Sequence, residues 1–160
     1  MYKRALVPLD GSPLAEAVIP FLMEIASPLQ MSIVLLRVRE PIPQLVGDGV
    51  RHALLDVGET YTRDLEAYLA SIAAPLRARK VDVSYAIRSG RPDEEIVAAA
   101  RDVGADLIAM STHGRSGLGR LLFGSVAEQV LRRADVPVLM IRHTTVPARS
   151  LGQERPTEKM

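Results

Sequence analysis

Cysteine is absent from the 160-residue chain, and so is tryptophan. Without cysteine there is no disulfide framework and no thiolate chemistry, which agrees with a reducing cytoplasm. No apolar run approaches the roughly 20 residues that a membrane-spanning helix needs. The first residues carry two positive charges but no apolar stretch of signal-peptide length. We therefore expect a cytoplasmic protein.

Aromatic side chains and excess charge are also scarce. The chain has four tyrosines and two phenylalanines, and its net charge is +1. So few aromatics argue against a stacking platform for single-stranded nucleic acid, and no overall field attracts nucleic acid or a membrane surface. The histidines His52, His113 and His143 have no suitably spaced partners, which argues against a metal cluster.

What the chain does contain is an alternation of strand-like and helix-like segments. Short apolar runs, typical of strands covered on both faces, recur at 5–9, 32–38, 81–87, 106–110 and 136–141. Residues 40–53, with two prolines and two glycines, are interpreted as a loop. The alternation predicts an α/β fold with a doubly wound, open five-stranded parallel sheet and helices on both faces. Ligands of such folds bind at the carboxyl ends of the strands.

Two helices have clear apolar faces. The first is expected to begin with Ser12 as N-cap and Pro13 in the first helical position. Its inward face is expected to hold Leu14, Val18, Phe21, Leu22 and Ile25. The long helix after the loop is expected to bury a stripe of Val57, Tyr61, Leu65, Tyr68, Leu69, Ile72 and Leu76.

A glycine-rich segment between the fourth strand and the last helix is the most informative feature. Residues 110–125 are MSTHGRSGLGRLLFGS. The N–H groups of such a loop, with those of the following helix N-terminus, suit a phosphate. The segment is not a Walker A loop, because Arg120 and Leu121 stand where Lys and Ser or Thr are required. It is not a dinucleotide fingerprint either, because Leu122 occupies the third glycine position.

The remaining pattern is Gly114, nine residues, then Gly124 and Ser125. It resembles the nucleotide-binding signature of the universal stress protein family, G-x2-G-x9-G-[S/T], with Ser111 in place of the first glycine. The resemblance extends over nearly all of residues 1–142, including the segments 2–12, 89–90, 105–114 and 124–141. We predict a family domain over residues 1–143 and a flexible C-terminal tail over 144–160.

The resemblance implies a Rossmann-like sheet of strand order 3-2-1-4-5 and membership of the subgroup that binds ATP. We expect Mg²⁺ on the phosphates of the bound ATP. In it, Asp10 would accept hydrogen bonds from ribose hydroxyls, Val38 and Met110 would flank the adenine, and backbone N–H groups would hold the phosphates. The expected nucleotide-binding residues are Pro8, Leu9, Asp10, Val38, Met110, Ser111, His113, Gly114, Arg115, Gly117, Gly124, Ser125 and Val126.

Plainer roles exist for several of these residues. Taken alone, Val38 and Met110 are better explained by core packing. His113 is interpreted as a hydrogen-bonding loop residue rather than an acid–base catalyst. Arg115 either neutralises polyphosphate or is a solvated loop charge.

The function we expect is that of an ATP-binding stress-response regulator, a nucleotide-dependent sensor or switch with an unknown protein partner. Hydrolysis would be slow at most, because no convincing general base lies near the phosphate cradle. The alternatives are a slow ATPase or phosphotransferase, and a nucleotide-free dimeric interaction module, which Ser111 favours.

The last strand indicates how the chain assembles. Pro137 lacks an N–H group and therefore belongs at a strand start or on a sheet edge. An exposed apolar edge promotes aggregation unless it is paired. We therefore expect a twofold homodimer through the last strand, from Val136 to Ile141.

Overall fold

The computed structural model describes residues 2–39, 48–113 and 124–143. Five parallel strands form one sheet in the order β3-β2-β1-β4-β5, which confirms the expected fold class and strand order. The strands are β1 (Arg4–Leu9), β2 (Ser32–Arg39), β3 (Val83–Ser89), β4 (Leu107–His113) and β5 (Val138–His143).

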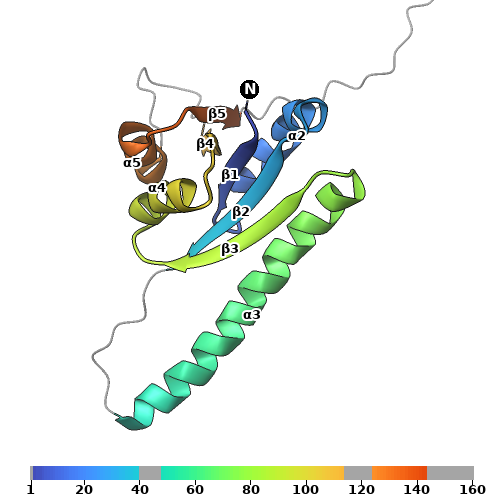
Figure 1. Cartoon of the computed structure of the whole chain (residues 1–160). Helices are drawn as coiled ribbons and strands as arrows, with labels where there is room; N and C mark the ends of the chain where they lie inside the picture. Colours follow the sequence, from blue (N-terminus) through green and yellow to red (C-terminus); the bar gives the residue numbers. More distant parts are fainter. Residues whose placement is uncertain (1, 40–47, 114–123, 144–160) are drawn as a thin grey trace, which may run out of the picture.

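Helices cover both faces of the sheet (Figure 1). One face carries α1 (Pro13–Glu16), α2 (Val18–Leu29) and α3 (Asp48–Ala78), and the other carries α4 (Pro92–Asp102) and α5 (Ser125–Arg133). Alternate side chains of each strand feed two separate cores. Leu35, for example, packs on the α2 and α3 side, and Leu36 packs on the α4 and α5 side. Among the described residues, no helix is both long and apolar enough to cross a membrane.

The sheet opens between its central strand, β1, and the neighbouring strand β4. β1 and β2 stay paired as far as Leu9 and Arg37, whereas the ladder between β1 and β4 contains only Ala5–Leu107 and Leu6–Ile108. The order in which strands are added to the sheet reverses at β1, since β2 lies on one side of β1 and β4 on the other. This is the topological switch point at which α/β sheets bind ligands.

Several strands are longer at their carboxyl ends than expected. β4 continues through Ser111 and Thr112 to His113, because these residues pair with Ile141, Arg142 and His143 of β5. The expectation that the glycine loop begins directly after Met110 was therefore wrong. Apolar periodicity did not reveal this end, because polar residues complete the ladder.

The first helix begins as expected but is divided. The Ser12 hydroxyl accepts a hydrogen bond from the Ala15 N–H at 3.1 Å, and Pro13 follows in the first turn. A break at Ala17 then separates α1 from α2. The inward face of α2 consists of Val18, Leu22, Met23 and Ala26, with Ile19 and Leu29 packed beside them.

Phe21 and Ile25 were expected on that inward face and are exposed instead, at 52% and 37%. Both lie on one flank of α2. The connection from β1 through α2 to β2 is a right-handed crossover, and the α-helix is itself right-handed. Together these two senses turn the flank with Phe21 and Ile25 toward the β5 edge of the sheet. Met23, on the opposite flank of α2, is turned toward α3. α2 and α5 flank β5 on opposite faces of the sheet (Figure 1).

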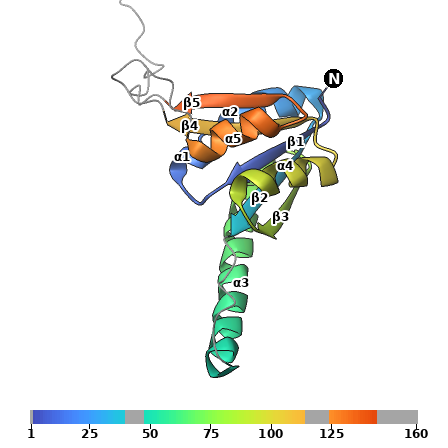
Figure 2. The same ribbon diagram turned by 90° about the vertical axis from the view of Figure 1, so that its left-hand side faces the viewer.

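α3 begins at Asp48, so residues 48–53, expected in a loop, are helical. Its 31 residues span about 46 Å, against about 23 Å for the seven residues of β3. The amino-terminal half therefore projects beyond the sheet (Figure 2). This explains why Tyr61, expected in the buried stripe, is 44% exposed while Leu65 and Leu69 are buried.

Candidate functional site

A cavity of about 330 Å³ occupies the switch point. Its walls come from the carboxyl ends of β1, β2 and β4 and from the first turns of α1, α4 and α5. Nine of the thirteen expected nucleotide-binding residues line it together: Pro8, Leu9, Asp10, Val38, Met110, Ser111, Gly124, Ser125 and Val126. Residues as far apart in the sequence as Pro8 and Val126 thus meet in one crevice.

The described part of the chain includes only the backbone of one of the other four expected residues, His113. His113 lies at the end of β4, where its backbone pairs with His143, so its expected place within a loop was wrong. Its side chain, and all of Gly114, Arg115 and Gly117, lie outside the described residues.

The first turn of α5 supplies anion-binding groups. Gly124 is the N-cap, and its carbonyl accepts the Glu128 N–H at 2.9 Å. A glycine has no side chain to cap the N–H groups of the first turn, and those of Ser125 and Val126 have no partner among the described residues at this positive end of the helix. Both residues line the cavity.

Gly124 does not need to be glycine for backbone reasons. Its φ of −54° and ψ of 152° suit any residue, and a Cβ built there would meet no atom of the described residues within 4 Å. As far as the described residues go, a side chain would instead enter open space at the end of α5. Backbone strain therefore does not explain why position 124 is a glycine. The explanation is the space that a side chain at this position would fill.

Asp10 places a carboxylate at the end of β1. Its Oδ1 accepts a hydrogen bond from the Ser12 N–H at 2.8 Å. Partial burial works to raise the pKa of Asp10, but the hydrogen bonds from Ser12 and the nearby charge of Arg37 outweigh it and hold that pKa below its ordinary value. Asp10 is therefore ionised at neutral pH. Its carboxylate accepts a hydrogen bond within the turn after β1, and the residue also lines the cavity.

The wall on the α4 and α5 side is apolar. Val38 and Met110 belong to the core on that face, and Ile96 and Ala127 complete it. Val38 and Met110 therefore pack in the core, as their plainer interpretation expected, and they also line the cavity. An apolar slot between a carboxylate and a helix N-terminus matches a flat ring that carries polar groups at one end.

Sequence reasoning missed several lining residues. They are Leu14, Ala15, Leu36, Arg37, Pro92, Ile96, Thr112 and Ala127. Most are neighbours of expected residues and follow from them once the strand and helix ends are known. Arg37 and Thr112 are the polar additions. Extending β4 beyond Met110 would have revealed Thr112, and the carboxyl end of β2 would have revealed Arg37.

Two buried side-chain atoms in the described chain have no hydrogen-bond partner, namely Arg37 Nε and Ser111 Oγ. Both residues line the cavity. Buried polar groups without partners are rare and cost roughly 1–3 kcal/mol each. Their gathering at one place distinguishes this cavity from the rest of the described interior.

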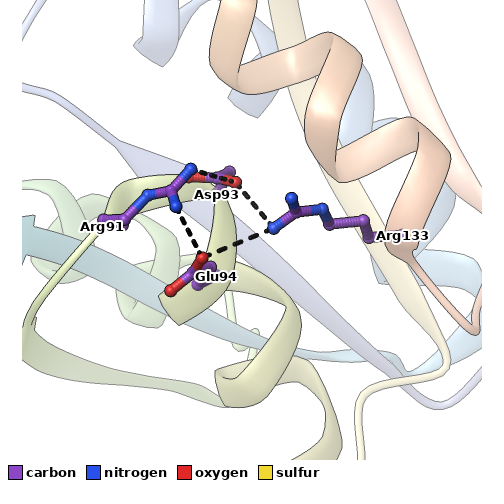
Figure 3. A network of polar contacts seen from close by, with 4 residues as sticks. All are labelled: Arg91, Asp93, Glu94 and Arg133. Atoms are coloured by element: carbon purple, nitrogen blue, oxygen red, sulfur yellow. Dashed lines mark hydrogen bonds and ion pairs between the residues drawn. The ribbon is translucent and has the colours of Figure 1, made fainter.

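α5 is attached to α4 by a charged network (Figure 3). Arg133 Nη1 lies 3.0 Å from Oδ2 of Asp93 and 3.6 Å from Glu94, and Arg91 approaches both carboxylates. Arg133 therefore has a structural role. Because Pro92 and Ile96 of α4 line the same cavity as the first turn of α5, this network fixes two of the cavity walls relative to each other.

The described residues offer no group of three or more His, Asp or Glu side chains suited to a metal ion. Asp10 is the one carboxylate among the described residues that line the cavity. The arrangement is therefore equipped to bind a ring, hydroxyls and an anion, while its described part presents one candidate base.

Comparison with known proteins agrees with this architecture. The model of the universal stress protein family matches residues 1–142. A universal stress protein of Methanocaldococcus jannaschii is 30% identical over 142 residues, which cover 89% of this chain and 83% of the relative.

Solved structures have the same fold. The structure of a second M. jannaschii universal stress protein superposes with a TM-score of 0.75 at 29% identity, covering 91% of this chain and 99% of that one. A universal stress protein in complex with cAMP gives a TM-score of 0.65 at 24% identity, covering 88% and 97%. The family match spans the whole sheet and both sides of the cavity, and the chain belongs to the universal stress protein family.

Proposed function

We propose that this chain binds ATP, with Mg²⁺ on the phosphates, in the switch-point cavity and acts as a nucleotide-dependent regulator in a stress response. The observation that carries the proposal is Gly124. This residue caps α5 in a conformation open to any amino acid, yet it places no side chain before the N–H groups of Ser125 and Val126, which have no partner among the described residues. Phosphate at a helix N-terminus requires such space.

The chemistry of the walls assigns the parts of the nucleotide. The base would lie against Val38 and Met110, the ribose hydroxyls would donate to Asp10, and the phosphates would meet the N–H groups of Ser125 and Val126. Gly114 and Arg115 belong to the proposed phosphate site through the sequence motif. The relative whose structure contains cAMP supports an adenine nucleotide as the ligand.

Regulation is a better proposal than rapid catalysis. Fast phosphoryl transfer needs a base or water-positioning group beside the terminal phosphate as well as charge stabilisation. Asp10 is held by Ser12 at the end of β1, which is the ribose end of the proposed site. Slow hydrolysis remains compatible with the site, since Mg²⁺ on the phosphates would itself assist it.

The second candidate is a nucleotide-free interaction module, and Ser111 is the observation that favours it. Its hydroxyl is buried without a partner at the position where the family signature has glycine. If this side chain closes the ribose end, the fold would serve only as a dimeric scaffold.

We also propose a homodimer through β5, within a family domain of residues 1–143. β5 is an edge strand, and Pro137 lies just before it, with its carbonyl accepting the Ile108 N–H at 3.0 Å. Exposed apolar side chains flank this edge on both faces: Phe21 and Ile25 on α2, and Leu131 on α5. Pairing with a second copy would cover the edge and both flanks.

Calorimetry of MgATP binding to nucleotide-stripped protein tests the proposal. We expect Gly124→Val to weaken binding at least about tenfold, because its side chain fills the phosphate space, and Gly124→Ala to be intermediate. The fold should lose about 1 kcal/mol or less, since the site is open and extended. Ala74→Val, on the exposed part of α3, is the matched control.

The Ser111→Gly variant separates the two candidates. If the wild type binds ATP and Ser111→Gly binds it equally or more tightly, the result supports the nucleotide site. Wild-type protein that binds no ATP, with binding restored by Ser111→Gly, supports the nucleotide-free module. An unchanged affinity in Gly124→Val would refute the assignment of the phosphate site.

A further inference from the structure

Arg37 is a charged residue within a sheet whose neighbouring positions are apolar. It follows Leu35 by two residues on β2 and therefore lies on the same face, toward α1, α2 and α3. Its register partner is Leu9, and its Nη1 donates to the Leu9 carbonyl at 3.2 Å. The guanidinium is thus attached to the residue directly before Asp10.

The groups around Arg37 form a small polar cluster. The Arg37 charge lies close enough to Asp10 and to Tyr68 to act toward a lower pKa of each side chain. Tyr68 comes from α3, and its hydroxyl donates to Oε1 of Glu16 at 2.8 Å. For Tyr68, burial and the contact with Glu16 outweigh the effect of Arg37, so its pKa is raised. The Arg37 guanidinium therefore lies near the Asp10 carboxylate and the neutral Tyr68 phenol, and Glu16 joins this cluster through Tyr68.

Fold stability alone gives a poor account of this arginine. Its Nε is buried without a partner, and an apolar side chain at this position would avoid the desolvation of a guanidinium. The next residue on the same face, Arg39, is different, because it lies outside the cavity and donates to Thr62 Oγ1 at 3.3 Å. Arg37 lines the cavity beside Asp10.

We propose that Arg37 is a positioning residue for ribose recognition, which orients the Asp10 carboxylate so that it accepts hydrogen bonds from the sugar hydroxyls. This inference rests on the proposed nucleotide site and adds a residue to it. Arg37 acts through Asp10 and not through the phosphates, because it is attached to the end of β1 whereas the phosphate cradle is at α5. The effect of Arg37 should therefore depend on the sugar hydroxyls and on an intact Asp10.

The test compares ATP with 2′,3′-dideoxy-ATP, which lacks both hydroxyls, by calorimetry. Arg37→Met should weaken ATP binding about tenfold and dideoxy-ATP binding less than about twofold, because charge-assisted hydrogen bonds are lost only where hydroxyls are present. Arg37→Lys should recover most of the ATP affinity. Arg39→Met is the matched control on the same strand face and should bind as the wild type does.

Two further measurements make the result decisive. In Asp10→Asn, adding Arg37→Met should cause little further loss, since residues that act together are not additive. In the absence of nucleotide, carboxyl NMR should find a higher pKa for Asp10 in Arg37→Met, because a neighbouring positive charge has been removed. Thermal unfolding identifies any variant that fails to fold, for which Arg37→Lys then provides the comparison.

The failures can be told apart. Equal losses for ATP and dideoxy-ATP, or additive losses with Asp10→Asn, would overturn the positioning role and leave the nucleotide site intact. A greater loss for ATP than for adenosine would make Arg37 a phosphate ligand and would also overturn it. Wild-type protein without any nucleotide binding would overturn the proposed function and this inference together, whereas an unchanged Asp10 pKa in Arg37→Met would refute the positioning role alone.

Discussion

Neutralising Asp93 should loosen α5 from α4 and lower the stability of the domain. The Asp93 side chain is 9% exposed and lies 3.0 Å from Arg133 Nη1 and 3.5 Å from Arg91 Nη2. Asp93→Asn keeps the shape and removes the charge, so it isolates the electrostatic contribution of this carboxylate. The perturbation reaches the cavity, because α4 and α5 each form part of its wall.

Three contributions set the expected magnitude. A hydrogen bond to a charged partner stabilises by roughly 1.5–3 kcal/mol. A carboxylate in the first turn of α4 adds about 0.3–1 kcal/mol through the helix dipole. The cost of burying the carboxylate opposes both, while Arg133 is 45% exposed and regains water when its partner is lost. We therefore expect Asp93→Asn to reduce the free energy of unfolding by about 2 kcal/mol, or about 4–8 °C in Tm.

Urea unfolding at pH 7 measures this value. The matched control is Glu94→Gln, one residue further along α4, where the side chain is 51% exposed and also contacts Arg91 and Arg133. We expect the control to lose less than about 0.5 kcal/mol, because exposed ion pairs contribute little. Salt should weaken the small effect of Glu94 more than that of Asp93.

The reasoning is refuted if Asp93→Asn and Glu94→Gln destabilise the protein equally, since burial is the property that separates them. A double-mutant cycle with Arg133→Gln provides a second check. The coupling energy between Asp93 and Arg133 should make up much of the loss, and a coupling near zero would show that the α4–α5 contact does not depend on this pair.

Two further predictions concern the edges of the fold. Asp106 accepts the Lys3 N–H at 2.7 Å and the Arg4 N–H at 3.0 Å; burial works to raise its pKa, but these hydrogen bonds outweigh it and lower that pKa in the folded protein. The contribution of the Asp106 carboxylate to stability is thus present above the unfolded pKa of about 3.9 and is lost as the pH falls through the lower folded value. Asp106→Asn should therefore reduce the free energy of unfolding by about 1 kcal/mol at pH 7 and progressively less below about pH 4. A difference between the two proteins that grew on acidification, measured by urea unfolding, would contradict this sign. Phe21→Glu should shift the proposed dimer toward monomer in sedimentation experiments. Tyr61→Glu, at a similarly exposed position on α3, should leave the dimer unchanged. A wild-type protein that is already monomeric at tens of micromolar would refute the proposed dimer.

Much of the fold was predictable because its signals are local. Buried parallel strands require apolar runs, such as residues 32–38, and the helices between them require a 3.6-residue period. Ser12 and Pro13 identified a helix start because a hydroxyl cap and a missing N–H group have meaning only there. The strand order required more than periodicity, and it came from the family resemblance.

The errors share a physical cause. Phe21 and Ile25 have the apolar character of an inward face, but only the position of α2 at the side of the sheet decides that they remain exposed. Ser111, Thr112 and His113 are polar, and pairing with β5 alone makes them part of a strand. Apolar periodicity reports that a side chain prefers burial, and it does not report whether neighbouring elements are there to bury it.

The candidate site divides in the same way. The glycine spacing and the Asp10-Gly-Ser element are continuous in the sequence, so they predicted the phosphate and ribose ends of the proposed site without a structure. Arg37 was missed, because its proposed role depends on Leu9 of the neighbouring strand β1 and on Asp10 directly after it. Local sequence determined the elements and their caps, since those depend on backbone and side-chain preferences within a few residues. Only the tertiary structure decided which strand ends meet at the cavity, which apolar side chains stay exposed and which buried polar atoms lack partners, because these depend on contacts between segments far apart in the chain.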